Sequence, residues 1–222
     1  TNKYIFGTAQ FSGKYGVTNK TGNLSQIEII KILKYLNKKK IHSLDTSTEY
    51  KLVDKKIKLG KYKKWKIITK INPERFKNCK NRSEIDDKII KILNLHKKNL
   101  GVKEISCLLL HNEKYLMSKK ANLLYSSIKY LKKKKYFKKF GYSIYSFKKL
   151  KKILSKLKPD IIQCPFNVFD RRLIEKSIYD LLKKNKVEVH VRSIFLQGLL
   201  LSNLEDIPKK FIKWKIYFKK WN

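Results

Sequence analysis

The stretch Ile105-Ser106-Cys107-Leu108-Leu109-Leu110 carries the strongest signal for the fold. Ser106 is its only polar residue, and the polar residues His111 and Asn112 follow at once. A short apolar run of this kind is typical of a strand that is buried on both faces of a sheet. Sheets covered on both faces are mostly parallel, because their crossover helices lie on the two faces. The run therefore predicts a central strand of a parallel sheet.

Similar short apolar runs lie on both sides of this stretch, and amphipathic segments separate them. The further strands are expected at 3–7, 41–44, 66–70, 137–143, 160–164 and 187–191. Apolar residues at helical spacing predict a helix capped by Ser25, a helix that starts at Ser83, three helices around 124–131, 147–157 and 174–182, and a helical, aromatic tail over 207–222. Strands and helices thus alternate along the whole chain.

This alternation, without a linker, predicts one α/β domain over residues 1–222 with right-handed parallel crossovers. An open doubly wound sheet and a closed barrel both satisfy it. Gly7, Gly13 and Gly16 lack the spacing of a dinucleotide-binding loop that opens a helix. Evenly spaced units favour a (β/α)8 barrel of the TIM type. We count about seven βα units and expect the last unit to be missing, so that the domain is incomplete at its C-terminal end.

The charge of the chain is extreme, but its composition argues against a specific nucleic-acid site. Lys and Arg number 55 against 17 Asp and Glu, which gives a formal net charge of +38, while 42% hydrophobic residues suffice for a packed core. Five basic residues are arginines, the residues that nucleic-acid readers use for bidentate and stacking contacts: Arg75, Arg82, Arg171, Arg172 and Arg192. Lysines spread over the whole chain, beside abundant Ile, Asn and Tyr, indicate an A/T-rich genome and a solvated surface. A lysine-rich binder of anionic surfaces or nucleic acid is the alternative.

Targeting and redox signals point to the cytoplasm. The sequence contains no run of 18 apolar residues, so we expect no membrane-spanning segment, and its first residues lack the apolar region of a signal peptide. Cys79, Cys107 and Cys164 are an odd number without metal-ligand spacing, which indicates buried thiols rather than disulfides or a metal site. The chain does not start with Met, and we therefore expect it to be processed, trimmed or a fragment.

Four residues with acid–base chemistry follow the ends of three consecutive expected strands. Asp45 and Tyr50 follow the second strand, Lys70 ends the third and His111 follows the fourth. In a barrel these ends meet at one mouth, where catalysis takes place. The Lys70 ammonium is expected to lower the phenol pKa of Tyr50 from its reference value near ~10, with Asp45 holding the ammonium in place. With His111 bonded to a carbonyl oxygen, the set can donate a proton to an aldehyde or ketone as it is reduced.

These residues, in this order, resemble those of the aldo-keto reductase family over essentially the whole chain. The family's Asp with a Tyr five residues on is matched by Asp45 and Tyr50, its strand-3 Lys by Lys70 in Ile67-Ile68-Thr69-Lys70, and its strand-4 His by His111 in Leu108-Leu109-Leu110-His111. The opening Gly7-Thr8-Ala9-Gln10-Phe11 is also similar. The resemblance implies an oxidoreductase that uses NADPH or NADH to reduce a small-molecule carbonyl substrate. A non-catalytic nicotinamide-binding subunit on the same fold is the alternative.

The resemblance extends to the cofactor site, with departures. Ser143 and Gln163 match the residues that hold the nicotinamide carboxamide, whereas Arg192, just before Ser193, replaces an aromatic residue that stacks on the ring. A guanidinium can also stack on a ring, so we expect Arg192 and Ser193 at the cofactor. Three other positions also differ from the family's pattern. Lys51 stands where a Gly commonly follows the Tyr, Val53-Asp54 where Ser-Glu is frequent, and Ile144 where an Asn usually follows the strand-5 Ser. Residues 163–172 and 191–200 resemble bacterial members associated with surface-polysaccharide gene clusters, which implies a sugar-derived substrate. The sequence predicts neither the substrate's identity nor the oligomeric state.

Overall fold

Seven strands form the centre of the protein in the computed structural model, which describes residues 3–20, 22–62, 64–112, 115, 118 and 121–221. The strands are β1 (Phe6–Gly7), β2 (Ser43–Asp45), β3 (Lys66–Ile71), β4 (Ile105–Leu110), β5 (Phe137–Ser143), β6 (Ile161–Pro165) and β7 (Glu188–Arg192). All seven predicted strands are therefore present, and those at 105–110 and 137–143 have the predicted bounds.

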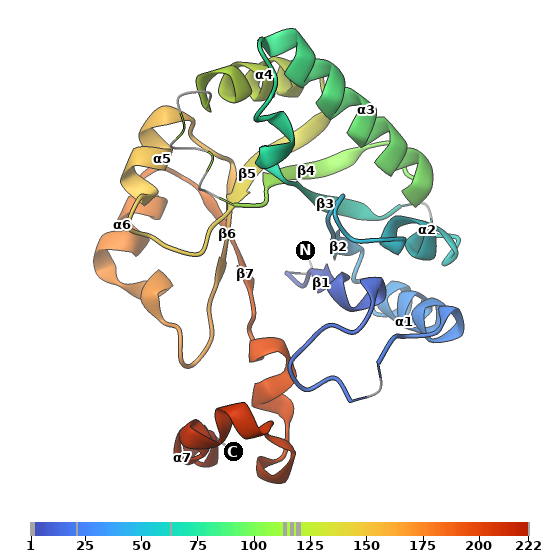
Figure 1. Cartoon of the computed structure of the whole chain (residues 1–222), viewed down its shortest axis with the longest axis vertical. Coiled ribbons are helices and arrows are strands. Elements are labelled where there is room, and N and C mark those ends of the chain that lie inside the picture. Colours follow the sequence, from blue (N-terminus) through green and yellow to red (C-terminus); the bar gives the residue numbers. More distant parts are fainter. Residues whose placement is uncertain are drawn as a thin grey trace.

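The strands form one parallel sheet in the order β1-β2-β3-β4-β5-β6-β7. Figure 1 shows this sheet curled around a central axis, with helices on its outer side. This is the predicted (β/α)8-barrel type with seven units, and no eighth strand occurs among the described residues. Because each strand pairs with its neighbour in sequence, all carboxyl ends of the strands lie at one mouth.

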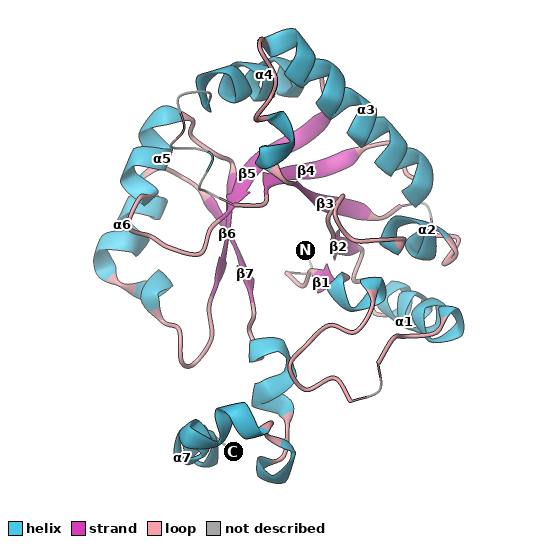
Figure 2. Ribbon diagram, in the orientation of Figure 1, coloured by secondary structure: helices cyan, strands magenta, loops and turns pink. Residues whose placement is uncertain are grey.

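Helices cover the outer face of the sheet, as Figure 2 shows. They are α1 (Gln26–Lys38), α2 (Val53–Lys58), α3 (Arg82–Leu100), α4 (Ala121–Lys133), α5 (Leu150–Lys156) and α6 (Lys176–Lys184). A last helix, α7 (Lys215–Trp221), lies in the tail, apart from the sheet. Ser25 caps α1 as predicted, in a reciprocal pair with Glu28. The predicted start of α3 at Ser83 is wrong by one residue, because the Asn81 side chain accepts a hydrogen bond from Glu84 N at 3.0 Å and caps the helix earlier.

The apolar core has two layers, one outside and one inside the curled sheet. The larger cluster lies between the sheet and its helices and contains residues such as Leu108, Leu110 and Ile162. The inner cluster comprises Ile68, Cys107, Leu109 and Ile161, which alternate along their strands with the outward residues. The fully apolar run at β4 thus reflects burial on both faces. All three thiols are free and buried.

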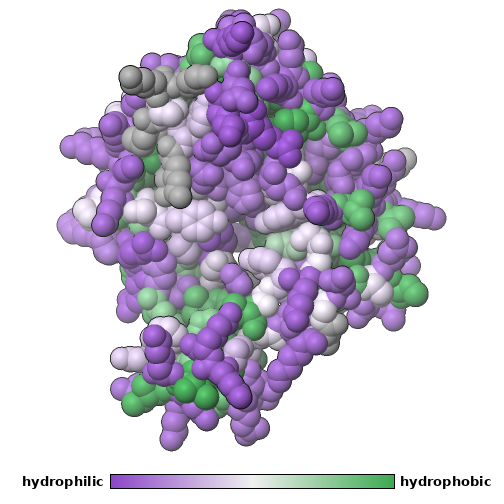
Figure 3. Space-filling model, viewed as in Figure 1, coloured by the Kyte–Doolittle hydropathy of each residue, from purple (hydrophilic) through white to green (hydrophobic). Residues whose placement is uncertain are grey.

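The segment after β7 forms a separate apolar cluster beside the mouth. Short 3₁₀ turns lead from β7 to α7, which fulfils the prediction of a helical tail. Leu199, Leu200, Ile207 and Phe218 are buried there against Val17 from the loop after β1. Figure 3 shows apolar residues gathered over this lower part of a mainly hydrophilic face. None of the described helices is both long and apolar enough to cross a membrane.

Candidate active site

A cleft of about 860 Å³ opens at the mouth of the sheet, and seven of the eight predicted site residues line it. The seven are Asp45, Tyr50, Lys70, His111, Ser143, Arg192 and Ser193. They come from the carboxyl ends of β2, β3, β4, β5 and β7 and from the turns that follow. The eighth, Gln163, lies on β6 beside Ser143, its partner in the strand register. The fold therefore brings all eight residues to one end of the sheet.

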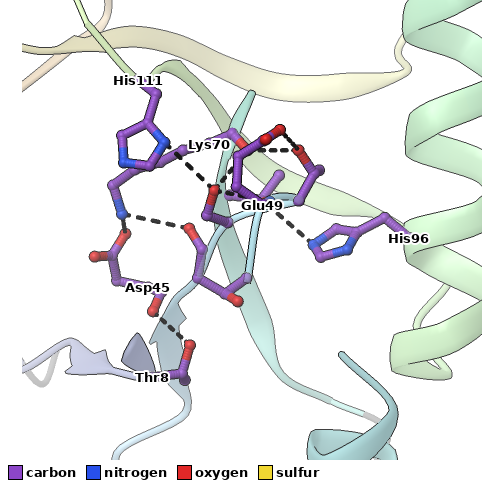
Figure 4. A network of polar contacts seen from close by, with 10 residues as sticks. Thr8, Asp45, Glu49, Lys70, His96 and His111 are labelled. Carbon is purple, nitrogen blue, oxygen red and sulfur yellow. Dashed lines mark hydrogen bonds and ion pairs between the residues drawn. The ribbon is translucent and has the colours of Figure 1, made fainter. Parts of the chain in front are cut away.

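Lys70 and Asp45 form an ion pair at the base of this cleft. The Lys70 Nζ contacts Asp45 Oδ1 and also donates to Thr46 O at 3.3 Å. The Lys70 side chain is 3% exposed and that of Asp45 is 18% exposed. A buried ammonium requires such a partner, because water no longer solvates its charge. Figure 4 shows Lys70 extended toward Asp45 with His111 on the same side of the strands.

Hydrogen bonds to main-chain oxygens fix the ends of β2 and β3, which carry Asp45 and Lys70. Thr8 donates to Asp45 O from its backbone N at 2.9 Å and from its hydroxyl at 3.0 Å. Thr48 donates to Lys70 O in the same way, from its N at 2.9 Å and its hydroxyl at 3.0 Å. The turn 46–49 therefore continues the pairing of β2 with β3 and carries Tyr50 over the pair. Two residues later Leu52 takes a left-handed conformation (φ 60°) before α2 begins.

Tyr50 and His111 lie next to each other in the cleft. Their ring centroids are 6.5 Å apart and the rings meet edge to face at 75°. Ser47 Oγ lies 3.5 Å from His111 Nδ1. Burial, and then the positive charge of Lys70, lower the pKa of His111, so the imidazole is neutral at pH 7.

The predicted direction of the Tyr50 pKa shift is wrong. Burial is the largest cause and raises the pKa of Tyr50 to about 12, and the negative charge of Asp45 raises it further. Arg192 is the cation that acts against this shift, whereas the charge of Lys70 is compensated by its contact with Asp45. The phenol therefore keeps its proton throughout the neutral range.

Two of the residues expected at the nicotinamide are buried, and one of them holds an unpaired acceptor atom. Gln163 is 3% exposed and Ser143 is 1% exposed. The Oε1 atom of Gln163 is buried and has no hydrogen-bond partner among the described residues, although a buried acceptor of this kind normally has one. The main chain between them is fixed, since Ile144 N donates to Gln163 O at 2.8 Å. This acceptor suits the N–H group of a carboxamide.

Arg192 has a partner that the sequence analysis did not identify. Its guanidinium carbon lies 4.0 Å from the centroid of the Tyr145 ring, and its Nη2 donates to Ile144 O at 3.1 Å. The guanidinium is thus stacked on a protein ring. Tyr145, two residues after Ser143 at a strand end, is an aromatic residue whose position could have indicated this role.

Two segments distant in sequence close one side of the cleft, and we call their contact the clasp. Lys20 forms an ion pair with Asp206, and Thr18 Oγ1 donates to Gln197 O at 3.3 Å. Gly198 adopts a φ of 96°, and a Cβ there would lie 2.3 Å from Thr18 Oγ1, so only glycine fits. No pattern in the sequence links residues 179 or 186 positions apart, and the clasp was not predicted.

Comparisons with known proteins agree with this geometry. Residues 3–220 match the model of the aldo/keto reductase family. An aldo-keto reductase from Bacillus halodurans in its holo form is similar in structure, with a TM-score of 0.72, 18% identity and coverage of 93% of this chain and 66% of that chain. A glycerol dehydrogenase from Gluconobacter oxydans gives a TM-score of 0.67, 18% identity and coverage of 93% and 64%. A Bombyx mori aldo-keto reductase in complex with NADP gives a TM-score of 0.63 and 14% identity, with coverage of 85% of this chain and 61% of that chain. The chain thus spans about two thirds of these proteins. No curated protein matches it by sequence.

Proposed function

Because the chain belongs to the aldo/keto reductase family, we propose that it reduces an aldehyde or ketone to an alcohol with NADPH or NADH as the hydride donor. One observation carries the proposal: Tyr50 and His111 meet edge to face in the cleft that Asp45 and Lys70 also line. These are a proton donor, a neutral hydrogen-bond partner and a fixed ion pair within one site.

Tyr50 is the proposed proton donor. Since its pKa is raised to about 12, the phenol is protonated at neutral pH and holds the proton that the carbonyl oxygen needs. His111, neutral because its pKa is lowered, orients the carbonyl by hydrogen bonding to the same oxygen. As hydride reaches the carbonyl carbon, the oxygen gains negative charge and its affinity for the phenol proton rises.

The ion pair of Lys70 and Asp45 is proposed to position these groups and to set the charge beneath them. Lys70 and Asp45 place a fixed dipole at the base of the cleft, beneath the groups between which the proton moves. Asp45 keeps that ammonium charged and fixed despite its burial. The pair changes no charge during the reaction and requires no reorganisation.

Ser143, Gln163, Arg192 and Ser193 are the residues proposed to hold the nicotinamide. The buried Oε1 of Gln163 supports this fit, because it can accept a hydrogen bond from the carboxamide. The bound cofactor supplies a hydride. The side chains of this chain determine where the ring lies and which atom receives the proton.

A polyhydroxylated, sugar-derived carbonyl compound is the proposed substrate class. The cleft is lined by amide and hydroxyl side chains, among them Gln10, Thr18, Ser202 and Asn203, which can hydrogen-bond to several hydroxyl groups. The three free, buried thiols support a reducing compartment, and we propose the cytoplasm.

Replacing the proton donor tests the proposal. Tyr50→Phe keeps the ring contact with His111 and removes the proton, so carbonyl reduction should fall by about 10²–10⁴-fold. Consumption of the reduced cofactor is measured with a panel of sugar-derived and simple aldehydes. Tyr15→Phe, which removes another phenol from the same cleft, is the matched control and should keep its activity. Undiminished turnover by Tyr50→Phe would falsify the assignment.

A further inference from the structure

Arg192 has a fixed position at the end of β7, beside the proposed nicotinamide site. Its Nη2 donates to Ile144 O at 3.1 Å, and Ile144 directly follows Ser143. Tyr145 covers one face of the guanidinium at 4.0 Å. Since Ile144 N in turn donates to Gln163 O at 2.8 Å, the guanidinium and the buried Gln163 acceptor belong to one small, rigid region of β5, β6 and β7.

The positive charge of Arg192 is not compensated by a carboxylate. Three cations are among the described residues that line the cleft, and two of them form ion pairs: Lys70 with Asp45, and Lys20 with Asp206. Arg192 contacts no carboxylate of the described chain, and its Nε is buried without a hydrogen-bond partner. Its charge also reaches the reacting groups, since it lowers the pKa of both Tyr50 and His111. The charge of Arg192 also lowers the pKa of Asp170, but that carboxylate forms its ion pair with Arg172. The cleft therefore has a positive charge without an ion-pair partner of its own.

We propose that Arg192 makes this cleft bind the reduced nicotinamide cofactor more tightly than the oxidised one, an inference that rests on the proposed function. The oxidised nicotinamide ring carries one positive charge and the reduced ring is neutral. Both forms carry the same phosphates, so attraction of the phosphates to the basic surface cancels in the comparison. Repulsion between the guanidinium and the charged ring remains, and salt screens it less than on the open surface because Arg192 is half-buried.

Such selection has a direct consequence for turnover. When hydride leaves for the carbonyl carbon and Tyr50 gives its proton to the oxygen, the ring beside Arg192 becomes a cation. Repulsion from the guanidinium then speeds dissociation of the oxidised cofactor and readies the cleft for the reduced form. An aromatic residue at position 192 would stack on either form, and the quadrupole of its ring would attract the cationic oxidised form rather than repel it.

Equilibrium titration of the protein's tryptophan fluorescence tests this inference without measuring activity. Dissociation constants are determined for NADPH and NADP⁺, and for NADH and NAD⁺. The wild-type protein should bind the reduced form at least about tenfold more tightly, a ratio that the repulsion of two nearby unit charges at a protein surface is large enough to produce. Arg192→Gln should bring the ratio of the two constants close to one, and Arg192→Lys should keep it.

Arg171→Gln is the matched control, because Arg171 forms no ion pair within the described chain and does not line the cleft. It lowers the net charge of the protein equally and should leave the ratio unchanged. A wild-type ratio near one, or an equal loss of affinity for both forms in Arg192→Gln, would overturn the inference while leaving the proposed function standing. Absence of binding of either form to the wild-type protein would refute the proposed function and the inference with it.

Discussion

At the scale of single residues, burial rather than neighbouring charge sets the protonation of the two reacting groups. Tyr50 and His111 are both neutral at pH 7, because the low polarity around them disfavours the phenolate and the imidazolium. The sequence placed both groups at the mouth correctly. The expected sign of the phenol pKa shift was wrong, because burial of the ring and the charge of Asp45 raise that pKa, and only the folded chain brings these influences together.

The raised pKa of Tyr50 predicts different pH profiles for the two directions of the reaction. Reduction consumes the phenol, which stays fully protonated below the pKa of about 12, so its rate should be level between about pH 7 and 9. Alcohol oxidation needs the phenolate, whose fraction rises about tenfold with each pH unit below that pKa. Initial rates in both directions over this range are the measurement. An oxidation rate that is already level at pH 8 would contradict the assignment.

The buried ion pair predicts a non-additive effect on stability. Lys70→Met leaves the Asp45 carboxylate without its partner and should lower the free energy of unfolding by about 3 kcal/mol or more. Adding Asp45→Asn should recover much of that loss, because no charge then remains buried, while activity stays absent. Urea unfolding of the single and double variants measures the coupling. Additive losses of stability would mean that the two groups do not interact in solution.

At the scale of elements, the sequence predicted the strands better than the short helices. A nearly continuous apolar run identified β4, since burial on two faces leaves a clear pattern. β5 was also predicted with its observed bounds, although it contains the exposed Lys138 and Lys139. Helix α2 was not predicted, because its six residues hold only two buried apolar positions, Val53 and Ile57. The helix expected from 147 begins at Leu150 instead, and Phe147 packs into the core before it.

The close approach of β6 to a glycine in β5 predicts that a larger residue there destabilises the sheet. A Cβ at Gly141 would lie 2.1 Å from Ile161 O, a backbone atom of the paired strand, so β5 and β6 would have to separate. Gly141→Ala should cost about 3 kcal/mol or more of stability. Gly7→Ala in β1 is the control, because no atom lies within 4 Å of its added Cβ, and it should change stability little. Thermal unfolding of both variants measures the difference. Equal midpoint temperatures for Gly141→Ala and Gly7→Ala would argue against this close packing of β5 and β6.

At the scale of the whole molecule, the net charge of +38 lies on a surface and the chemistry lies in the cleft. Lysines are spread over the chain, and Figure 3 shows hydrophilic residues over most of one face. Lys70 at the base of the cleft pairs with Asp45, and Lys20 at its rim pairs with Asp206, which lies 186 positions away in the sequence. The sequence therefore indicated a site distinct from the basic surface. The clasp that closes one side of this site could not be predicted from the sequence.

This separation predicts weak, nonspecific binding of nucleic acid. Duplex DNA should bind without sequence preference, and its affinity should fall about a thousandfold between about 50 mM and about 200 mM salt. Tyr50→Phe should leave this binding unchanged, because the phenol carries no charge there. Fluorescence anisotropy with two unrelated duplexes measures both properties. Sequence-selective binding at physiological salt would favour the lysine-rich binder over the reductase.

The clasp also orders events during folding. Its contacts join residues that are 179 and 186 positions apart in the sequence. Bringing Lys20 to Asp206 therefore closes a loop that contains most of the chain. Contacts of such long sequence separation form late, because closing the loop costs conformational entropy before the contact contributes any stabilisation. Local βα units can assemble first, each beside its predecessor in the sheet. The rim of the cleft is then the last part of the molecule to become native, and amide hydrogens there should exchange with solvent sooner than those of β4.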